Sequence, residues 1–210
     1  MIERYPVLKE CRQSISNAYC LMEECYEHEG KLLIAGNGGS AADSEHIAGE
    51  LMKCFKVPRP ITKELAERLM EIDPVRGAWL SEKLERALPA IPLVAHEALS
   101  TAFNNDVDGS GVFAQRLLGL GRSGDVFLGI STSGNSKNVV LAAILAKALG
   151  IRVIGLTGAQ GGELAALSDI AVKVPQTETF MVQELHLPIY HCWCLMLEER
   201  FFGDTARSRL

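Results

Sequence analysis

The stretch Lys31-Leu32-Leu33-Ile34-Ala35-Gly36-Asn37-Gly38-Gly39-Ser40 decides the fold class of this chain. Its first five residues form a short apolar run, which is typical of a buried strand. The glycine-rich residues that follow are typical of a tight turn, and a helix is expected to begin at about Ser40. The segment therefore predicts a strand, a loop and a helix in succession.

The same order of elements recurs twice further along the chain. Strands are predicted over 125–130 and 152–156, each followed by a polar or glycine-rich loop and then by a helix, over 137–149 and 163–167. Further strands are expected at 91–94 and 170–174, and long helices at 7–29, with Gly30 as its stop, and at 178–201. Strands separated by helices pair in parallel, so the predicted fold class is α/β, a three-layer α/β/α sandwich around a central parallel sheet.

Residues 55–88 interrupt this alternation. Prolines surround two stretches in which apolar residues have helical spacing, Leu65, Leu69 and Ile72 in the first and Trp79, Leu80 and Leu84 in the second. We expect a helical insertion at 55–88 within a single domain that spans 1–210. Extra packing surface and a cap over a neighbouring site are both open roles for it.

Length and charge exclude several classes of function. The 210 residues suit one globular domain, and 21 Lys+Arg against 26 Asp+Glu give a net charge of −5. Without a basic cluster, neither nucleic acid nor an acidic membrane is an expected partner. No apolar run approaches the roughly 20 residues that span a bilayer, and the first residues lack the pattern of a signal peptide, so we expect a cytoplasmic protein. Its six cysteines are expected to be reduced thiols.

Two polar loops are candidates for binding a phosphate group. In open parallel sheets, ligands bind beyond the carboxyl ends of the strands, where helix N-termini attract anions. Neither loop has the lysine of a nucleotide-binding P-loop, which favours a sugar monophosphate, although ordinary helix capping also explains the hydroxyls. The candidate residues are Asn37, Gly38, Gly39 and Ser40 in the first loop, and Ser131, Thr132, Ser133 and Ser136 in the second.

Three ordered motifs resemble the sugar isomerase (SIS) domain, specifically its phosphoheptose isomerase branch. They are LIAGNGGSAAD at 33–43, GISTSGNS at 129–136, and QELH at 183–186 followed by His191. The resemblance runs from the first helix to about Phe201, without residues 55–88. It implies a flavodoxin-like SIS fold and an aldose–ketose isomerase that interconverts sedoheptulose 7-phosphate and D-glycero-D-manno-heptose 7-phosphate, for bacterial heptose biosynthesis. It also implies a homotetramer with sites at subunit interfaces, and Zn²⁺ in several members.

The resemblance assigns roles to particular residues. Isomerisation through a cis-enediol needs a base and a proton donor, and the family pattern implies Glu50 as the base and His191 as the acid. The same pattern implies one zinc ion per subunit, with His46, Glu50, Gln183 and His191 as ligands. His46 and Glu50 are four residues apart, so they share one face of the predicted helix. Asp106 and Thr179 match residues that contact substrate in the family; for Asp106, a capped turn is the competing explanation.

The chain also departs from the family pattern. Lys53-Cys54-Phe55 stands where Gly-Arg-Phe or Gly-Arg-Tyr is common, and Met181 stands where an arginine is frequent. These departures leave an isomerase of another phosphosugar as an alternative. A noncatalytic SIS scaffold, of the type that binds a bacterial replication initiator, is a further alternative; it should lack the Glu50 and His191 pair, which this chain retains.

Overall fold

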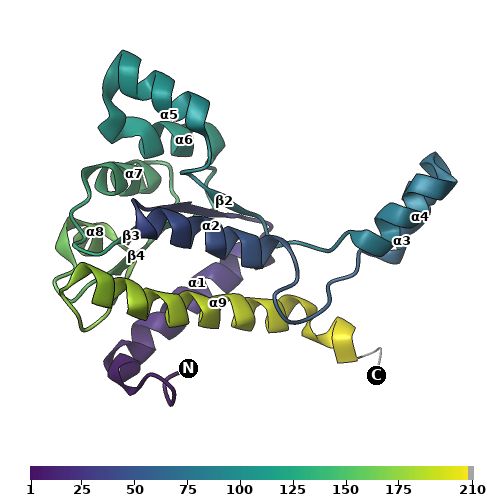
Figure 1. Ribbon diagram of the computed structural model, residues 1–210, viewed down its shortest axis with the longest axis horizontal. Coiled ribbons are helices and arrows are strands. Elements are labelled where there is room, and N and C mark those ends of the chain that lie inside the picture. Colours follow the sequence, from purple (N-terminus) through teal and green to yellow (C-terminus); the bar gives the residue numbers. More distant parts are fainter. Residues whose placement is uncertain (208–210) are drawn as a thin grey trace.

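The computed structural model describes residues 1–207 and contains a five-stranded sheet between two layers of helices (Figure 1). The strands are β1 (Leu32–Ala35), β2 (Ala90–Pro92), β3 (Val126–Ser131), β4 (Arg152–Thr157) and β5 (Ile170–Lys173). Their order is β2-β1-β3-β4-β5, and every neighbouring pair is parallel. The predicted α/β sandwich is confirmed.

Helices cover both faces of the sheet because successive residues of each strand point to opposite sides. Leu32 and Ile34 pack in one core with α1 (Arg12–Glu27), α2 (Gly39–Met52) and α9 (Thr179–Arg207). Leu33 and Ala35 pack in the other core with α6 (Val112–Leu120), α7 (Lys137–Ala148) and α8 (Gly162–Leu167). The short α5 (Glu97–Phe103) precedes a π-turn and a 3₁₀ turn over 104–111. Along residues 1–207, no helix combines the length and the apolar character needed to cross a membrane.

The first predicted helix is two elements rather than one. Pro6–Cys11 forms a 3₁₀ helix with Pro6 in its first turn, and the α-helix begins only at Arg12. Cys11 donates its thiol hydrogen to the carbonyl of Lys173, at an Sγ···O distance of 3.0 Å. Leu8 and Cys11 are buried. Packing of this turn against the β5 end of the sheet thus replaces the continuous helix that the sequence pattern favoured.

The end of α1 also differs from the prediction. The left-handed residue is Glu29, with φ 60°, and not Gly30. The Gly30 amide closes the helix by donating to the Cys25 carbonyl at 2.9 Å. A Cβ atom at Gly30 would lie 2.7 Å from Cys25 Sγ and 2.8 Å from the Gly124 oxygen. Glycine is needed here for close approach rather than for positive φ.

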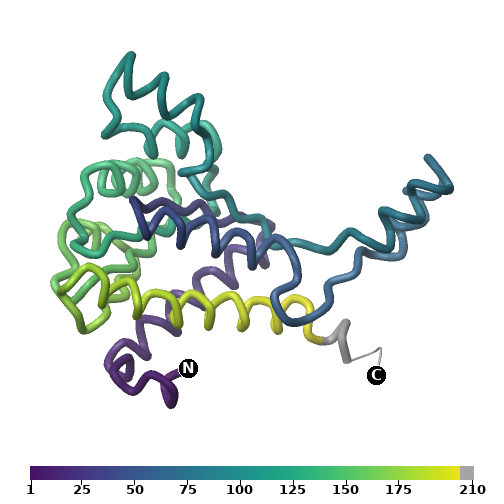
Figure 2. Tube along the Cα trace, in the orientation of Figure 1, coloured from purple at the N-terminus to yellow at the C-terminus, as the bar shows by residue number. Residues whose placement is uncertain are grey.

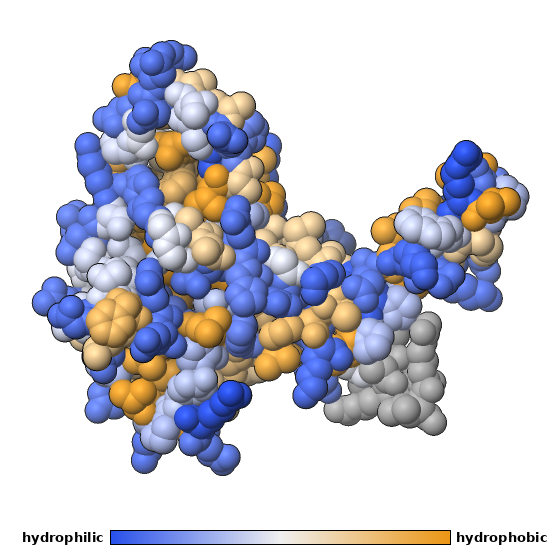
Figure 3. Space-filling view, viewed as in Figure 1, coloured by the Kyte–Doolittle hydropathy of each residue, from blue (hydrophilic) through white to orange (hydrophobic). Residues whose placement is uncertain are grey.

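The insertion is helical, as predicted, and forms a hairpin that projects from the body of the chain (Figures 1 and 2). Its helices are α3 (Lys63–Ile72) and α4 (Pro74–Lys83), which cross closely where Gly77 meets the backbone of Leu69. Gly77 is the one buried residue of the two helices. Apolar side chains lie at the surface of this hairpin (Figure 3), among them Ile72 and Trp79. Within one chain, the hairpin therefore adds almost nothing to the core.

The last helix is longer than predicted. It runs from Thr179 to Arg207 as one α-helix, with Pro188 inside it. Proline removes one backbone hydrogen bond, but the helix continues because its inner face is held by tertiary packing. Ile189, Trp193 and Leu197 are among the buried residues of this face. The helix lies beside α2 and runs in the same direction (Figure 1), since Gly39 meets Gln183 and His46 meets His191.

Candidate active site

The two polar loops lie side by side at one edge of the sheet. They follow β1 and β3, the neighbouring strands between which the strand order reverses, and ligand-binding crevices open at such switch points. Asn37 in the first loop and Asn138 in the first turn of α7, directly after the second loop, form two reciprocal side-chain hydrogen bonds of 2.8 and 2.9 Å. The structure thus brings the two predicted phosphate-binding loops together.

The second loop is pre-ordered by its own hydroxyl groups. Ser131 Oγ lies 2.9 Å from Ser136 Oγ and accepts from the Gly134 amide at 3.1 Å. Ser133 Oγ accepts from the Asn135 amide at 3.1 Å. Ser131 is buried, while Ser133 is exposed and Thr132 is half-buried. Part of the hydroxyl set therefore supports the turn, and the outward-facing part is available to a ligand at the N-terminus of α7.

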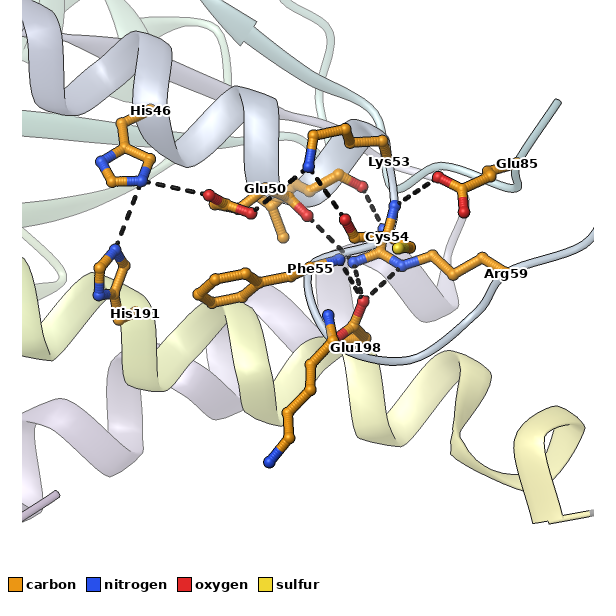
Figure 4. Close-up of polar contacts among 11 residues, drawn as sticks. His46, Glu50, Lys53, Cys54, Phe55, Arg59, Glu85, His191 and Glu198 are labelled. Atoms are coloured by element: carbon orange, nitrogen blue, oxygen red, sulfur yellow. Dashed lines mark hydrogen bonds and ion pairs between the residues drawn. The ribbon is translucent and has the colours of Figure 1, made fainter. Parts of the chain in front are cut away.

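Three predicted catalytic or metal-binding side chains meet between α2 and α9 (Figure 4). His46 Nε2 lies 3.2 Å from Glu50 Oε1 and 3.4 Å from His191 Nε2. Glu50 is largely buried, with 16% of its side chain exposed, whereas 42% of the His46 side chain is exposed. A carboxylate and two imidazoles therefore share one site that solvent reaches from one side.

The ring of His191 lies among other aromatic rings. Phe55 packs against it at a centroid distance of 5.5 Å, and His46 lies edge-on at 5.0 Å. Burial lowers the pKa of His191, the neighbouring His46 lowers it further, and Glu50 opposes both. A lowered pKa favours the neutral imidazole near pH 7, in which one nitrogen donates and the other accepts.

Tyr190 and Asp43 complete the site, and the sequence analysis missed both. The Tyr190 hydroxyl donates to Asp43 Oδ1 at 3.0 Å and lies 3.2 Å from His46 Nδ1. Burial raises the pKa of Tyr190, and the Asp43 carboxylate raises it further. The available signals were position and spacing: Tyr190 adjoins His191, and Asp43 is three residues before His46, on the same face of α2.

Three other predicted site residues lie apart from this group. The amide of Gln183 packs on Gly39, about two helical turns before His46, since a Cβ at Gly39 would lie 2.5 Å from Gln183 Nε2. Thr179 is exposed at the start of α9. Asp106 is exposed and accepts from the Asn105 side chain at 2.8 Å, while Asp108 caps the following turn through Ser110. Within one chain, these residues do not join the acid–base cluster.

The donor atoms of the cluster suit a cation. Because an ionised Asp43 only accepts, Tyr190 donates to it, and the Tyr190 oxygen then accepts from His46 Nδ1–H. In a neutral His46 with its proton on Nδ1, the lone pair of Nε2 faces Glu50 Oε1. Both of these atoms are then acceptors, so a proton or a cation is needed between them. Glu50 Oε2 is also buried without a hydrogen-bond partner.

Two imidazoles and a carboxylate are ligands that zinc accepts. Residues 1–207, however, contain no group of three or more His, Cys, Asp or Glu side chains whose arrangement could already hold a metal ion. The site fits zinc through the chemistry of its donors rather than through a finished coordination geometry.

Comparisons with known proteins agree with this architecture. Two family models, each described as SIS domain, match residues 5–87 and 98–197. The phosphoheptose isomerase of Aneurinibacillus thermoaerophilus is 40% identical over 185 residues, covering 88% of this chain and 80% of that protein. The phosphoheptose isomerase structure from Francisella tularensis has a TM-score of 0.77 at 31% identity, covering 93% and 91% of the two chains. That from Neisseria gonorrhoeae has a TM-score of 0.73 at 32% identity and 94% coverage of both.

The parallel sheet, the two loops at its switch point and the carboxylate–imidazole cluster define a SIS-domain protein of the sugar-phosphate isomerase class. The matched relatives narrow this class, because they exceed 30% identity over most of both chains. The chain belongs to the phosphoheptose isomerase family. The family and the enzyme class that the sequence predicted are confirmed.

Proposed function

We propose that this chain interconverts sedoheptulose 7-phosphate and D-glycero-D-manno-heptose 7-phosphate through a cis-enediol. The observation that carries the proposal is the meeting of Glu50 and His46 with His191 between α2 and α9, since α2 begins at the first polar loop. The similarity of this chain to phosphoheptose isomerases supports the same substrate pair. Assaying both directions with the purified chain tests the proposal, and inactivity on both sugars would refute it.

In this mechanism, the substrate phosphate binds at the 131–136 loop and the N-terminus of α7, which leaves C1 and C2 near the cluster. Glu50 removes the proton from one carbon and returns it to the other. His191, neutral because of its environment, exchanges a proton with the sugar oxygens. Tyr190 and His46 orient these groups through their hydrogen bonds.

Phosphate recognition makes a first prediction. Ser133→Ala removes an exposed hydroxyl together with the hydrogen bond that it accepts from the Asn135 amide. The Ser131 hydroxyl, with its contacts to Ser136 and the Gly134 amide, still holds the turn. Because a hydrogen bond to a charged group contributes about 1.5–3 kcal/mol, KM should rise by about 10–100-fold with little change in kcat. Steady-state kinetics measure both, with inorganic phosphate as a competitor. A fall in kcat at constant KM would contradict this assignment.

We further propose one zinc ion per subunit, held by His46, Glu50 and His191, with the Gln183 amide as a fourth donor after side-chain rotation. Bound zinc supplies Lewis-acid polarisation of oxygen atoms in sites of this kind. A residue that binds the ion cannot at the same moment act as a free acid or base. Metal content therefore decides which role Glu50 and His191 have.

The zinc proposal predicts close to one equivalent of zinc in protein purified without chelator, measured by elemental analysis. His46→Ala should lower this value to near zero, because it removes the imidazole between the other two donors. His96→Ala, which alters an exposed histidine at the start of α5, is the matched control and should keep the metal. Metal-free protein with full activity would refute the proposal.

We also propose a homotetramer with active sites at subunit interfaces, in the cytoplasm, where its six free cysteines would stay reduced. A groove of about 820 Å³ beside His191 supports shared sites, since it is lined mainly by apolar side chains such as Tyr5, Tyr19 and Phe55. If a second copy covers this groove, activity per chain should fall as dilution dissociates the assembly. Mass photometry across the same concentrations checks this, and full activity in a monomeric sample would contradict it.

An isomerase of another phosphosugar is the second candidate. Cys54 and Met181 stand at positions where the resemblance led us to expect arginines, and Met181 is exposed at the start of α9. Assays with shorter ketose phosphates separate this candidate from the first.

A further inference from the structure

A buried ion pair joins the two helices that carry the cluster. Arg59 and Glu198 are both fully buried. Arg59 Nε donates to Glu198 Oε1 at 2.9 Å, and Nη2 of the same guanidinium lies 2.8 Å from that oxygen (Figure 4). The ring of Phe202 lies 4.6 Å from the guanidinium carbon. Glu198 is on α9, seven residues or about two turns beyond His191.

The same guanidinium holds the end of α2. Arg59 Nη1 donates to the Leu51 carbonyl at 2.6 Å, and Nη2 donates to the Glu50 carbonyl at 3.0 Å. These two carbonyls belong to the last turn of a helix that ends at Met52, where carbonyls lack partners within the helix. The backbone at Glu50 is therefore held from outside its own helix.

Glu198 holds the segment that follows α2. Its Oε1 accepts from the Phe55 amide at 2.7 Å, and its Oε2 accepts from the Lys56 amide at 2.8 Å. This fixes the backbone of Phe55, whose ring packs on His191. One carboxylate thus restrains both the end of α2, through Arg59, and the aromatic neighbour of His191.

The side chain of Glu50 has little else to hold it. Its Oε1 contacts His46, and its Oε2 is buried without a hydrogen-bond partner; Lys53 Nζ lies 4.0 Å away. The direction of the carboxylate therefore depends strongly on the backbone from which it extends, and that backbone is anchored by Arg59.

We propose that Arg59 and Glu198 are positioning residues for the isomerisation, which hold the carboxylate of Glu50 against His46 and near His191 from the C-terminal end of α2. This inference rests on the proposed function and extends it, because neither residue touches the reacting atoms. A displacement of about 1 Å of a catalytic group can cost about 10²-fold in rate, so loss of this anchor should lower kcat. The phosphate loop lies on other elements, so KM should stay within about twofold.

The test compares Arg59→Met, Arg59→Lys and the double variant Arg59→Met/Glu198→Met. Arg59→Met leaves a buried carboxylate unpaired and should be strongly destabilised. The double variant removes both charges and should recover part of the lost stability, although the backbone groups that the pair had held lose their partners. If the pair positions Glu50, the double variant is folded and more stable than Arg59→Met but keeps a kcat about 10²-fold low. Arg59→Lys retains the charge and should recover part of kcat.

Asp125→Asn is the matched control. Asp125 is a buried carboxylate that pairs with Lys31 at 2.7 Å and accepts from the backbone amides of Lys31 and Arg122. It lies directly before β3, at the opposite ends of the strands from the two loops. It should lower stability and leave the kcat of folded protein unchanged. Recovery of kcat together with stability in the double variant would overturn the proposal, as would an unchanged kcat in all Arg59 variants.

The activity of the wild-type chain separates failure of the proposed function from failure of the positioning role. An inactive wild-type chain refutes the proposed function, and with it the positioning role. An active wild-type chain whose double variant retains full kcat refutes only the positioning role.

Discussion

Glu50→Gln should abolish isomerisation while the chain still folds and assembles. The amide keeps the shape of the side chain and can still hydrogen-bond to His46, but it cannot accept a proton from carbon. General acid–base groups contribute about 10²–10⁴-fold, and a group that also binds metal should lie at the upper end of this range. The corresponding loss of transition-state stabilisation is about 3–5 kcal/mol.

Exchange with D₂O measures this step directly. Wild-type protein should introduce deuterium into sedoheptulose 7-phosphate, because the proton passes through Glu50, and the variant should not. Glu45→Gln is the matched control, since Glu45 is an exposed glutamate on the same helix. Undiminished exchange in Glu50→Gln would leave the reaction in place and exclude Glu50 as the base. An unfolded variant is recognised by circular dichroism, and Glu50→Asp then tests the same point.

Gly134→Ala should be one of the most destabilising single substitutions in the phosphate loop. Gly134 has φ 71°, and a Cβ atom there would lie 1.9 Å from the Gly161 carbonyl oxygen. The added strain combines a left-handed backbone, about 1–2 kcal/mol, with overpacking against another backbone segment, about 1–3 kcal/mol. The free energy of unfolding should fall by about 2–5 kcal/mol, as measured by urea titration, and KM should rise because the loop is displaced.

Gly38→Ala provides the comparison. Gly38 also has positive φ, 56°, but a Cβ atom there would meet nothing within 4 Å. Its substitution should cost only the backbone contribution, about 1–3 kcal/mol, because its backbone, with ψ −121°, has a conformation that residues with a side chain rarely adopt. Equal losses for the two variants would show that the contact between Gly134 and Gly161 does not matter.

The local sequence determined much of this architecture. Apolar runs followed by Gly36–Ser40 and Ser131–Ser136 predicted where strands end and where loops open, and the structure has β1, β3 and their helices within a residue or two of these positions. This works because strand burial, turn formation and helix initiation depend on neighbouring residues. The four-residue spacing of His46 and Glu50 likewise predicted a shared helix face.

Tertiary packing alone decided the rest. The 3₁₀ start at Pro6 depends on a contact of Cys11 with Lys173, and the left-handed residue is Glu29 because Gly30 is needed against Gly124. Gln183 packs on Gly39 and His191 meets His46, because α2 and α9 lie side by side and run in the same direction.

Arg59 shows most clearly what the sequence could not reveal. Between two prolines it reads as a solvated charge, yet it is fully buried against Glu198, 139 residues away. Periodicity reports which face of an element is apolar, but it contains no information about which distant partner satisfies a buried charge. The sequence by itself determined the order of the elements and the chemical types present at the site. The folded chain decided which side chains meet, because those contacts join segments that are remote in sequence.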